Sequence, residues 1–154
     1  MKRIIVYFSW SNNTKRLVEE IVKEEPMDVV RVERLIPYSK DYNQCAYVEA
    51  KEEIDQRIHP AIKKLNINFN DYDEILLFFP IWWYTFPMPI ATFIEQLNGY
   101  KGQVVLFGNS YTNDPQYMEN SIRDFKVINK PIDELIENFY NNEKNQWFRI
   151  MSNN

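Results

Sequence analysis

Three short apolar runs constrain the fold more than any other feature of the 154-residue sequence. They cover residues 4–8, 75–79 and 104–107, and no charged residue interrupts them. Runs of this length, rich in β-branched and aromatic residues, are typical of parallel strands that are covered on both faces. Residues 28–33 mix valines with charged residues, which favours the edge of a sheet. A further strand is expected over residues 125–128.

Helical patterns separate these runs. Residues 14–25 and 89–98 each place apolar side chains at helical spacing along one face, and Pro89 suits a first helical turn. Residues 41–57 also favour a helix. An apolar stripe near the end of the chain predicts a last helix, and it consists of Ile132, Leu135, Ile136 and Phe139.

The alternation of strands and helices, without repeats or linkers, predicts right-handed crossovers and a parallel sheet. We expect one three-layer α/β domain over residues 1–154, doubly wound around a five-stranded parallel sheet of order 2-1-3-4-5. The three apolar strands belong at its centre and residues 28–33 at its edge. The chain has only 3 glycines, which excludes a Gly-rich dinucleotide fingerprint and a Walker loop.

Composition excludes several classes of function. The net charge of −4 argues against a dedicated nucleic-acid binder. No apolar run reaches the roughly 18–20 residues needed to cross a bilayer. Cys45 and His59 are the only residues of their kinds, so neither a disulfide scaffold nor a Cys/His zinc site is expected, and the cytoplasm is the expected compartment. Neither residue has a recognisable third partner, so no catalytic residue and no metal site are predicted.

Ligands of open α/β sheets bind beyond the carboxyl ends of the strands, where three loops follow the apolar runs. The first loop offers hydroxyls, amides and the start of a helix, whose free N–H groups and dipole suit a phosphate. It contains no lysine or arginine, so neutral donors would hold the anion, and ordinary helix capping is the alternative. The candidate residues are Ser9, Trp10, Ser11, Asn12, Asn13 and Thr14.

The second loop is rich in aromatic residues and carries no charge. Because loops usually lie on the surface, burying these rings requires a tertiary partner or a flat ligand. Stacking on a nucleobase contributes roughly 1–3 kcal/mol per ring. Packing between sheet and helix, or a protein–protein patch, are the alternatives. The candidate residues are Pro80, Ile81, Trp82, Trp83, Tyr84 and Thr85.

The third loop is polar, and its candidates are Asn109, Ser110 and Tyr111. Their amide and hydroxyl groups suit the edge of a heteroaromatic ring or a sugar-like chain, whereas a plain turn into a helix capped by Asp114 is the alternative. Together the three loops predict a ligand with a phosphate at one end and a flat heterocycle at the other, which is the shape of flavin mononucleotide (FMN).

At these residues the chain resembles the flavodoxin-like flavoproteins, in particular bacterial flavodoxins with Ser-Trp-Ser-Gly-Asn-Thr and Pro-Ile-Trp-Trp-Gly loops. The resemblance rests on residues 9–14 and 80–83, with support from residues 38–43 and 71–73. It implies non-covalent FMN, with its phosphate at the first loop, its isoalloxazine beside the second, and its ribityl and pyrimidine parts near the third.

Two residues depart from that pattern where the subgroup has glycine. Asn12 is a mild change, since Asn tolerates a left-handed backbone. Tyr84 is expected to penalise a positive φ by roughly 1 kcal/mol or more. In flavodoxins a peptide beside the ring N5 flips and stabilises the one-electron-reduced flavin. We therefore predict weaker stabilisation of that state than in typical flavodoxins.

The primary hypothesis is an FMN-binding redox protein that carries electrons between a reductase and an acceptor, with no side chain required as acid or base. The alternative is an FMN-dependent NAD(P)H oxidoreductase that acts on quinones or other aromatic acceptors. A third hypothesis is a non-redox binding module that has lost flavin. The expected partners are therefore a redox protein or a small aromatic acceptor, and neither nucleic acid nor a membrane.

Overall fold

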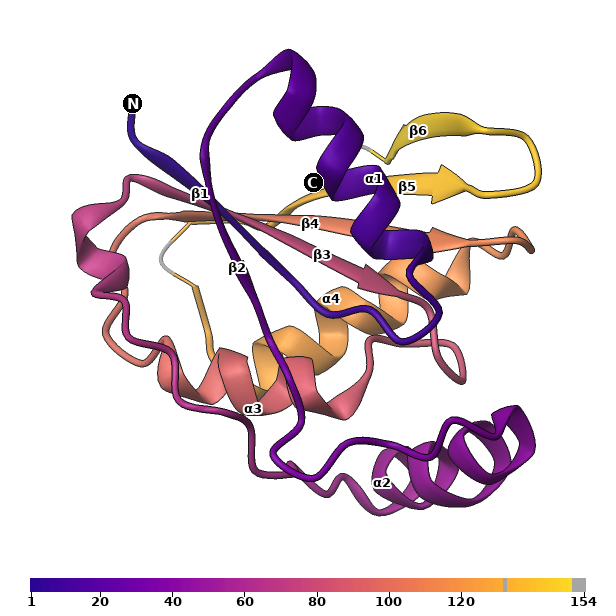
Figure 1. The fold of residues 1–154 in the computed structure, drawn as a ribbon. Coiled ribbons are helices and arrows are strands. Elements are labelled where there is room, and N and C mark those ends of the chain that lie inside the picture. Colours follow the sequence, from indigo (N-terminus) through magenta and orange to yellow (C-terminus); the bar gives the residue numbers. More distant parts are fainter. Residues whose placement is uncertain (132, 151–154) are drawn as a thin grey trace.

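The computed structural model describes residues 1–131 and 133–150 of the chain. Within these residues six strands form one sheet of order β2-β1-β3-β4-β5-β6 (Figure 1). The first five strands are parallel, and β6 pairs antiparallel with β5. The strands are β1 (Arg3–Tyr7), β2 (Asp28–Arg31), β3 (Glu74–Pro80), β4 (Gln103–Ser110), β5 (Ile136–Asn141) and β6 (Gln146–Ile150). The expected order 2-1-3-4-5 is confirmed, whereas the sixth strand was not predicted.

Helices cover both faces of the sheet, as Figure 1 shows. α1 lies on one face and α3 and α4 lie on the other, while the crossover from β2 to β3 carries a π-helical turn and α2 beside the α3 layer. The helices are α1 (Asn13–Glu24), η1 (Gln44–Ala50), α2 (Lys51–Gln56), the short 3-10 turn η2 (Phe69–Asp71), α3 (Met88–Gln96) and α4 (Gln116–Ile128).

Alternation along the central strands divides the core into two parts. Ile4 and Val6 of β1 point into a large cluster under α3 and α4, whereas Ile5 and Tyr7 point into a smaller cluster under α1. All four side chains are buried. Burial on both faces is the reason that the central runs are uninterrupted by charge, and the charged segment β2 forms the edge as predicted.

Two predictions near the end of the chain were wrong. Residues 125–128 form the last turn of α4 and not a strand, and the predicted helix at residues 135–139 lies largely in β5. Both errors have the same cause, because polar residues occupy buried positions there. Ser121 and Asp124 interrupt the apolar stripe of α4, and Glu137 interrupts the alternation of β5. Ile132 lies outside the described residues.

The register of the sheet places the three candidate loops at one edge. Tyr7 at the end of β1 lies opposite Phe78 of β3, and Pro80 at the end of β3 lies opposite Asn109 of β4. The segments that follow these strands therefore open on the same side of the sheet, at the reversal of strand order between β1 and β3.

Candidate functional site

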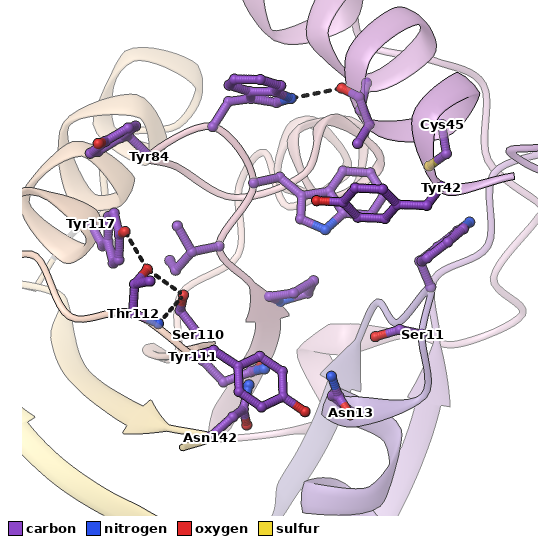
Figure 2. Close-up of a pocket in the computed structure, with 18 of the residues that line it drawn as sticks. Ser11, Asn13, Tyr42, Cys45, Tyr84, Ser110, Tyr111, Thr112, Tyr117 and Asn142 are labelled. Atoms are coloured by element: carbon purple, nitrogen blue, oxygen red, sulfur yellow. Dashed lines mark hydrogen bonds between the residues drawn. The ribbon is translucent and has the colours of Figure 1, made fainter. Parts of the chain in front are cut away.

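A pocket of about 580 Å³ lies between the three loops and η1 (Figure 2). Its volume falls within the roughly 300–1,000 Å³ of small-molecule sites. None of the described residues that line it carries a charged side chain. The lining residues are Trp10, Ser11, Asn13, Tyr42, Cys45, Ala46, Tyr47, Ala50, Pro80, Ile81, Trp82, Trp83, Tyr84, Asn109, Ser110, Tyr111, Thr112, Tyr117 and Asn142.

The structure brings eleven of the fifteen predicted site residues to this pocket. They comprise Trp10, Ser11, Asn13, Asn109, Ser110, Tyr111 and all predicted members of the second loop except Thr85. In the described part of the chain the other four predicted residues do not line the pocket. These four are Ser9, Asn12, Thr14 and Thr85, and three of them are buried. Their hydrogen bonds, or in Asn12 the backbone conformation, set the shape of the two loops.

The first loop is organised by hydrogen bonds to its own helix. Asn12 is the N-cap of α1 with φ 68°, a left-handed conformation that Asn tolerates, and its side chain makes no capping hydrogen bond. Ser9 Oγ accepts a hydrogen bond from the backbone N–H of Lys15 at 3.3 Å. Thr14 Oγ1 donates to Asn109 Oδ1 at 2.8 Å, which joins the first loop to the third. At the start of an α-helix the first N–H groups, here those of Asn13 and Thr14, have no intrahelical partner, and Asn13 lines the pocket.

The cations near this loop are engaged in an ion pair or in hydrogen bonds, two of which are made with residues of the loop itself. Lys15 Nζ pairs with Glu19 at 3.9 Å, and Arg16 Nη2 donates to Asn13 Oδ1 at 2.8 Å. Arg31 Nη2 donates to the backbone carbonyl of Ser9 at 2.8 Å. The positive end of the helix dipole and neutral donors are thus the electrostatic features that this side of the pocket offers an anion.

The second loop contains a tight two-residue turn at residues 82–85. Trp82 N–H donates to the Thr85 carbonyl at 2.8 Å, and Thr85 N–H donates to the Trp82 carbonyl at 3.2 Å. Trp83 has φ 48° and Tyr84 has φ 67°, so both central residues are left-handed. Two positive φ values at these positions define a type I′ turn, which Asn-Gly favours. For bulky residues each such conformation costs about 1–2 kcal/mol.

Contacts with distant segments hold this turn. Thr85 Oγ1 donates to Asp124 Oδ2 at 2.8 Å, and Asn120 Nδ2 donates to the Tyr84 carbonyl at 3.1 Å. Trp83 Nε1 donates to the carbonyl of Ala46 at 2.8 Å, and the Tyr84 ring packs edge-on against Tyr117 with centroids 5.2 Å apart.

The third loop presents a chain of hydroxyl groups. Ser110 Oγ lies 3.2 Å from Thr112 Oγ1, which lies 2.6 Å from the Tyr117 hydroxyl. Tyr111 is exposed, and in Figure 2 its ring lies between Asn142 and Asn13 at one side of the pocket. This side of the pocket therefore combines polar groups with one exposed aromatic side chain.

Sequence analysis missed eight lining residues. Five come from the crossover after β2: Tyr42, Cys45, Ala46, Tyr47 and Ala50. The other three are Thr112, Tyr117 and Asn142. The crossover was predicted as a plain helix, but residues 44–50 are π-helical, a rare form that is frequent at functional sites. The one available signal was the pair of tyrosines on a helix whose apolar stripe is irregular.

The crossover adds an aromatic wall to the pocket. Trp10, Tyr42, Tyr47 and Trp83 form a chain in which successive ring centroids lie 6.2, 6.1 and 5.4 Å apart. Cys45 is buried beside this wall, and burial raises the pKa of its thiol to about 11. The thiol is therefore protonated at neutral pH, and it behaves as a small apolar residue.

A buried polar network supports Trp82 from behind. The Tyr38 ring packs edge-on against Trp82 with centroids 5.3 Å apart, and its hydroxyl donates to Glu53 Oε1. Arg34 reaches the other oxygen of Glu53, with Nη2 at 3.1 Å. Burial raises the pKa of Glu53 above its ordinary value, and the hydrogen bonds from Tyr38 and Arg34 offset only part of that rise. This network fixes the position of one wall of the pocket.

No helix among the described residues is long and apolar enough to cross a membrane. Within residues 1–131 and 133–150, no group of three or more His, Cys, Asp or Glu side chains is arranged to hold a metal ion.

Comparison with known proteins is consistent with this architecture. A solved flavoprotein of Lactobacillus acidophilus NCFM in complex with FMN is 26% identical, covers 88% of this chain and 90% of its own, and superposes with a TM-score of 0.75. The apo form of the flavoprotein from that organism is 27% identical, with a TM-score of 0.66 over 87% of this chain and 90% of its own.

A sequence relative is the "Uncharacterized NAD(P)H oxidoreductase YcaK" of Escherichia coli (strain K12). It is 22% identical over 100 residues, which is 60% of this chain, so the matched region spans about half (51%) of that relative's length. The family model described as Flavodoxin matches residues 2–148. The chain therefore belongs to the flavodoxin family.

Proposed function

We propose that the chain binds FMN non-covalently in this pocket and serves as an electron-transfer flavoprotein. One observation carries the proposal: an uncharged pocket joins the start of α1 to a wall of aromatic rings, at the reversal of strand order. The solved relative from L. acidophilus holds FMN in the same fold, which supports the choice of ligand.

The first loop fits a phosphate monoester. The free N–H groups at the start of α1, the Ser11 hydroxyl and the Asn13 amide supply neutral donors. The left-handed Asn12 turns the backbone so that it enters the helix beside the pocket. Since the lining has no cation, the helix dipole and these donors would compensate the charge of the phosphate.

The second loop and η1 fit a flat ring. Trp82, Trp83, Tyr84 and Tyr42 offer aromatic faces and edges around the pocket, and none of the neighbouring lining groups is charged. Asn109, Ser110 and Thr112 place polar groups on the opposite side, where they suit the polar edge and side chain of a flavin. The pocket therefore separates apolar from polar contacts as this ligand requires.

FMN, when bound, supplies the redox chemistry itself. The contribution of the chain is to bind the cofactor, orient its ring among the aromatic side chains and exclude water from one of its faces. None of the described residues that line the pocket has a charged side chain, and burial raises the pKa of the Cys45 thiol.

A second function, FMN-dependent oxidation of NAD(P)H, is favoured by one observation. The E. coli relative is described as an uncharacterized NAD(P)H oxidoreductase, although it is matched over only about half (51%) of its length. An acceptor for such an enzyme would be flat and aromatic, such as a quinone, because aromatic rings surround the pocket. The Lys51 ammonium lies over the outer Trp83 ring, 5.1 Å from its centroid.

Anaerobic kinetics on the FMN-loaded protein separate the two functions. A carrier is reduced slowly by free NADPH or NADH and rapidly when a flavodoxin reductase is added. An oxidoreductase consumes NAD(P)H in the steady state with 1,4-benzoquinone and needs no partner protein. If the flavin is reduced rapidly neither through the reductase nor by NAD(P)H alone, both functions are contradicted.

A further inference from the structure

One face of α4 grips the tight turn at residues 82–85. Asn120 and Asp124 lie four residues apart, which places them on the same side of the helix. Asn120 holds the carbonyl of Tyr84, and Asp124 holds the hydroxyl of Thr85. Both contacts reach across 36 residues or more of sequence. The turn therefore depends on a helix that lies far from it along the chain.

The turn needs these tertiary contacts because the residues at its centre disfavour its backbone conformation. A type I′ turn requires two left-handed residues, and glycine or asparagine normally supplies them. Here Trp83 and Tyr84 occupy both positions. Conformations of this kind persist only where the surrounding structure over-determines them.

Thr85 is the residue through which α4 acts on the turn. Its backbone closes the turn with Trp82 in both directions, and its side chain is fixed by Asp124. Thr85 is 3% exposed and Asp124 is 6% exposed, so water is excluded from the hydrogen bond between them. The hydrogen bond from the Thr85 hydroxyl to Asp124 therefore fixes the last residue of the turn, directly after the two left-handed residues.

The ion pairs of Asp124 do not account for its burial. Its other partners are Arg57, with Nη1 at 2.9 Å, and Arg123, with Nε at 3.1 Å. The side chains of these arginines are 51% and 58% exposed, and pairs with exposed partners contribute little to stability. The buried contact of Asp124 is the one with Thr85.

We infer that Asp124 is a positioning residue for the ligand-facing turn, and that it acts through the hydroxyl of Thr85 with support from Asn120. It holds Trp83 and Tyr84 in a backbone conformation that their side chains disfavour. In this way it keeps the aromatic wall of the pocket in a shape ready for a flat ligand. The effect on flavin affinity rests on the proposed function, whereas the effect on the turn does not.

A set of matched variants tests this inference. Thr85→Val removes the hydroxyl while keeping a similar shape, and Thr85→Ser restores it. Tyr84→Gly removes one of the two backbone penalties and leaves the one at Trp83, so the turn should depend less on the contacts with α4. Each Thr85 variant is made in the wild-type and the Tyr84→Gly background, and Asp124→Leu is made alone and with Thr85→Val.

The first readout is amide hydrogen exchange by NMR in the protein without FMN. We expect Thr85→Val to accelerate exchange at the Trp82 and Thr85 amides by about tenfold, because one buried hydrogen bond is lost. Thr85→Ser should stay near wild type, and Asp124→Leu should match Thr85→Val without adding to it. The Leu77 amide in the centre of β3 serves as the reference for global unfolding.

The second readout is the FMN dissociation constant from quenching of flavin fluorescence. Thr85→Val should raise it about fivefold in the wild-type background and less than about twofold with Tyr84→Gly. Equal effects in both backgrounds, or accelerated exchange at Leu77 as well as at the turn, would overturn the inference. If the wild-type chain binds no FMN, the proposed function fails, and the exchange experiment still decides the inference.

Discussion

The first loop and the tight turn of the second loop face the same pocket, and both bend the backbone into a left-handed conformation without glycine. The first loop uses Asn12, whose short polar side chain tolerates that conformation. The turn uses Trp83 and Tyr84, which do not. The residue type at Asn12 accounts for the conformation of the first loop, whereas contacts with α4 and η1 hold the turn in a conformation that its own residues disfavour.

This difference separates local from tertiary encoding of a binding site. On the phosphate side the left-handed conformation is one that Asn12 itself tolerates, although Ser9, Trp10 and Thr14 also form hydrogen bonds with distant segments. The aromatic side is specified by contacts between segments far apart in sequence, so it should respond to changes on α4.

The largest effect is expected at Glu137, which lies in β5 away from both loops. Glu137 is 5% exposed, and its buried Oε2 has no hydrogen-bond partner among the described residues. Burial raises the pKa of Glu137 to about 7 from the model-compound value of 4.5. Between pH 4.5 and 7 the folded state keeps the proton that the unfolded state has lost, so stability falls as the pH rises.

Glu137→Gln should remove that fall. Urea unfolding at pH 8 should show the variant more stable than wild type by about 3 kcal/mol, whereas near pH 4.5 the two should agree. Flavin affinity should stay unchanged, which separates global stability from the shape of the pocket. The same pH dependence in both proteins would contradict the prediction.

The next effect tests the local encoding of the first loop. Asn12→Val should lower the free energy of unfolding by about 2 kcal/mol, because a β-branched residue is disfavoured at φ 68°. Asn12→Gly should lie within about 0.5 kcal/mol of wild type, since glycine adopts this conformation freely. Chemical denaturation measures both values, and equal losses would show that the conformation of Asn12 is not what matters.

A matched pair tests the penalty in the turn. Tyr84→Gly and Tyr84→Ala both lose the contact with Tyr117, but only glycine relieves the strain at φ 67°. The glycine variant should therefore be more stable than the alanine variant by about 1 kcal/mol. If the alanine variant is as stable as the glycine variant, the backbone at Tyr84 is not strained.

The smallest effect concerns the redox balance of bound flavin. Flipping the peptide between Trp83 and Tyr84 would convert the turn to type II′, whose first central position takes glycine. Trp83 disfavours that flip, so we expect an anaerobic redox titration to show little of the one-electron-reduced flavin. Trp83→Gly should raise its fraction. A large fraction in the wild-type protein would contradict the account of a fixed turn.

Sequence patterns predicted the parts of this protein whose burial and polarity agree. The central strands are apolar because both faces are covered, and the loops at their ends could be read from strand order alone. The patterns failed where buried positions are polar, as at Asp124 and Glu137. No local signal marks Asp124 as the partner of Thr85, since 39 residues separate them.

The residues of the candidate site also divide into those that loop composition indicated and those that it did not. Ser11, Trp82 and Tyr111 belong to loops whose composition indicated a ligand, and the structure brings them to one pocket. Tyr42 and Tyr47 reach the pocket from a crossover whose π-helical geometry has no recognisable signature in the sequence. Their contribution depends on how the crossover folds back over the sheet.

The most direct test of the account is a titration of the ligand-free protein with FMN and with riboflavin, followed by flavin fluorescence. We predict saturable quenching by one FMN per chain, with riboflavin at least about tenfold weaker because it lacks the phosphate that the start of α1 would hold. Unchanged fluorescence with both compounds would contradict the central claim that this uncharged pocket is a flavin site.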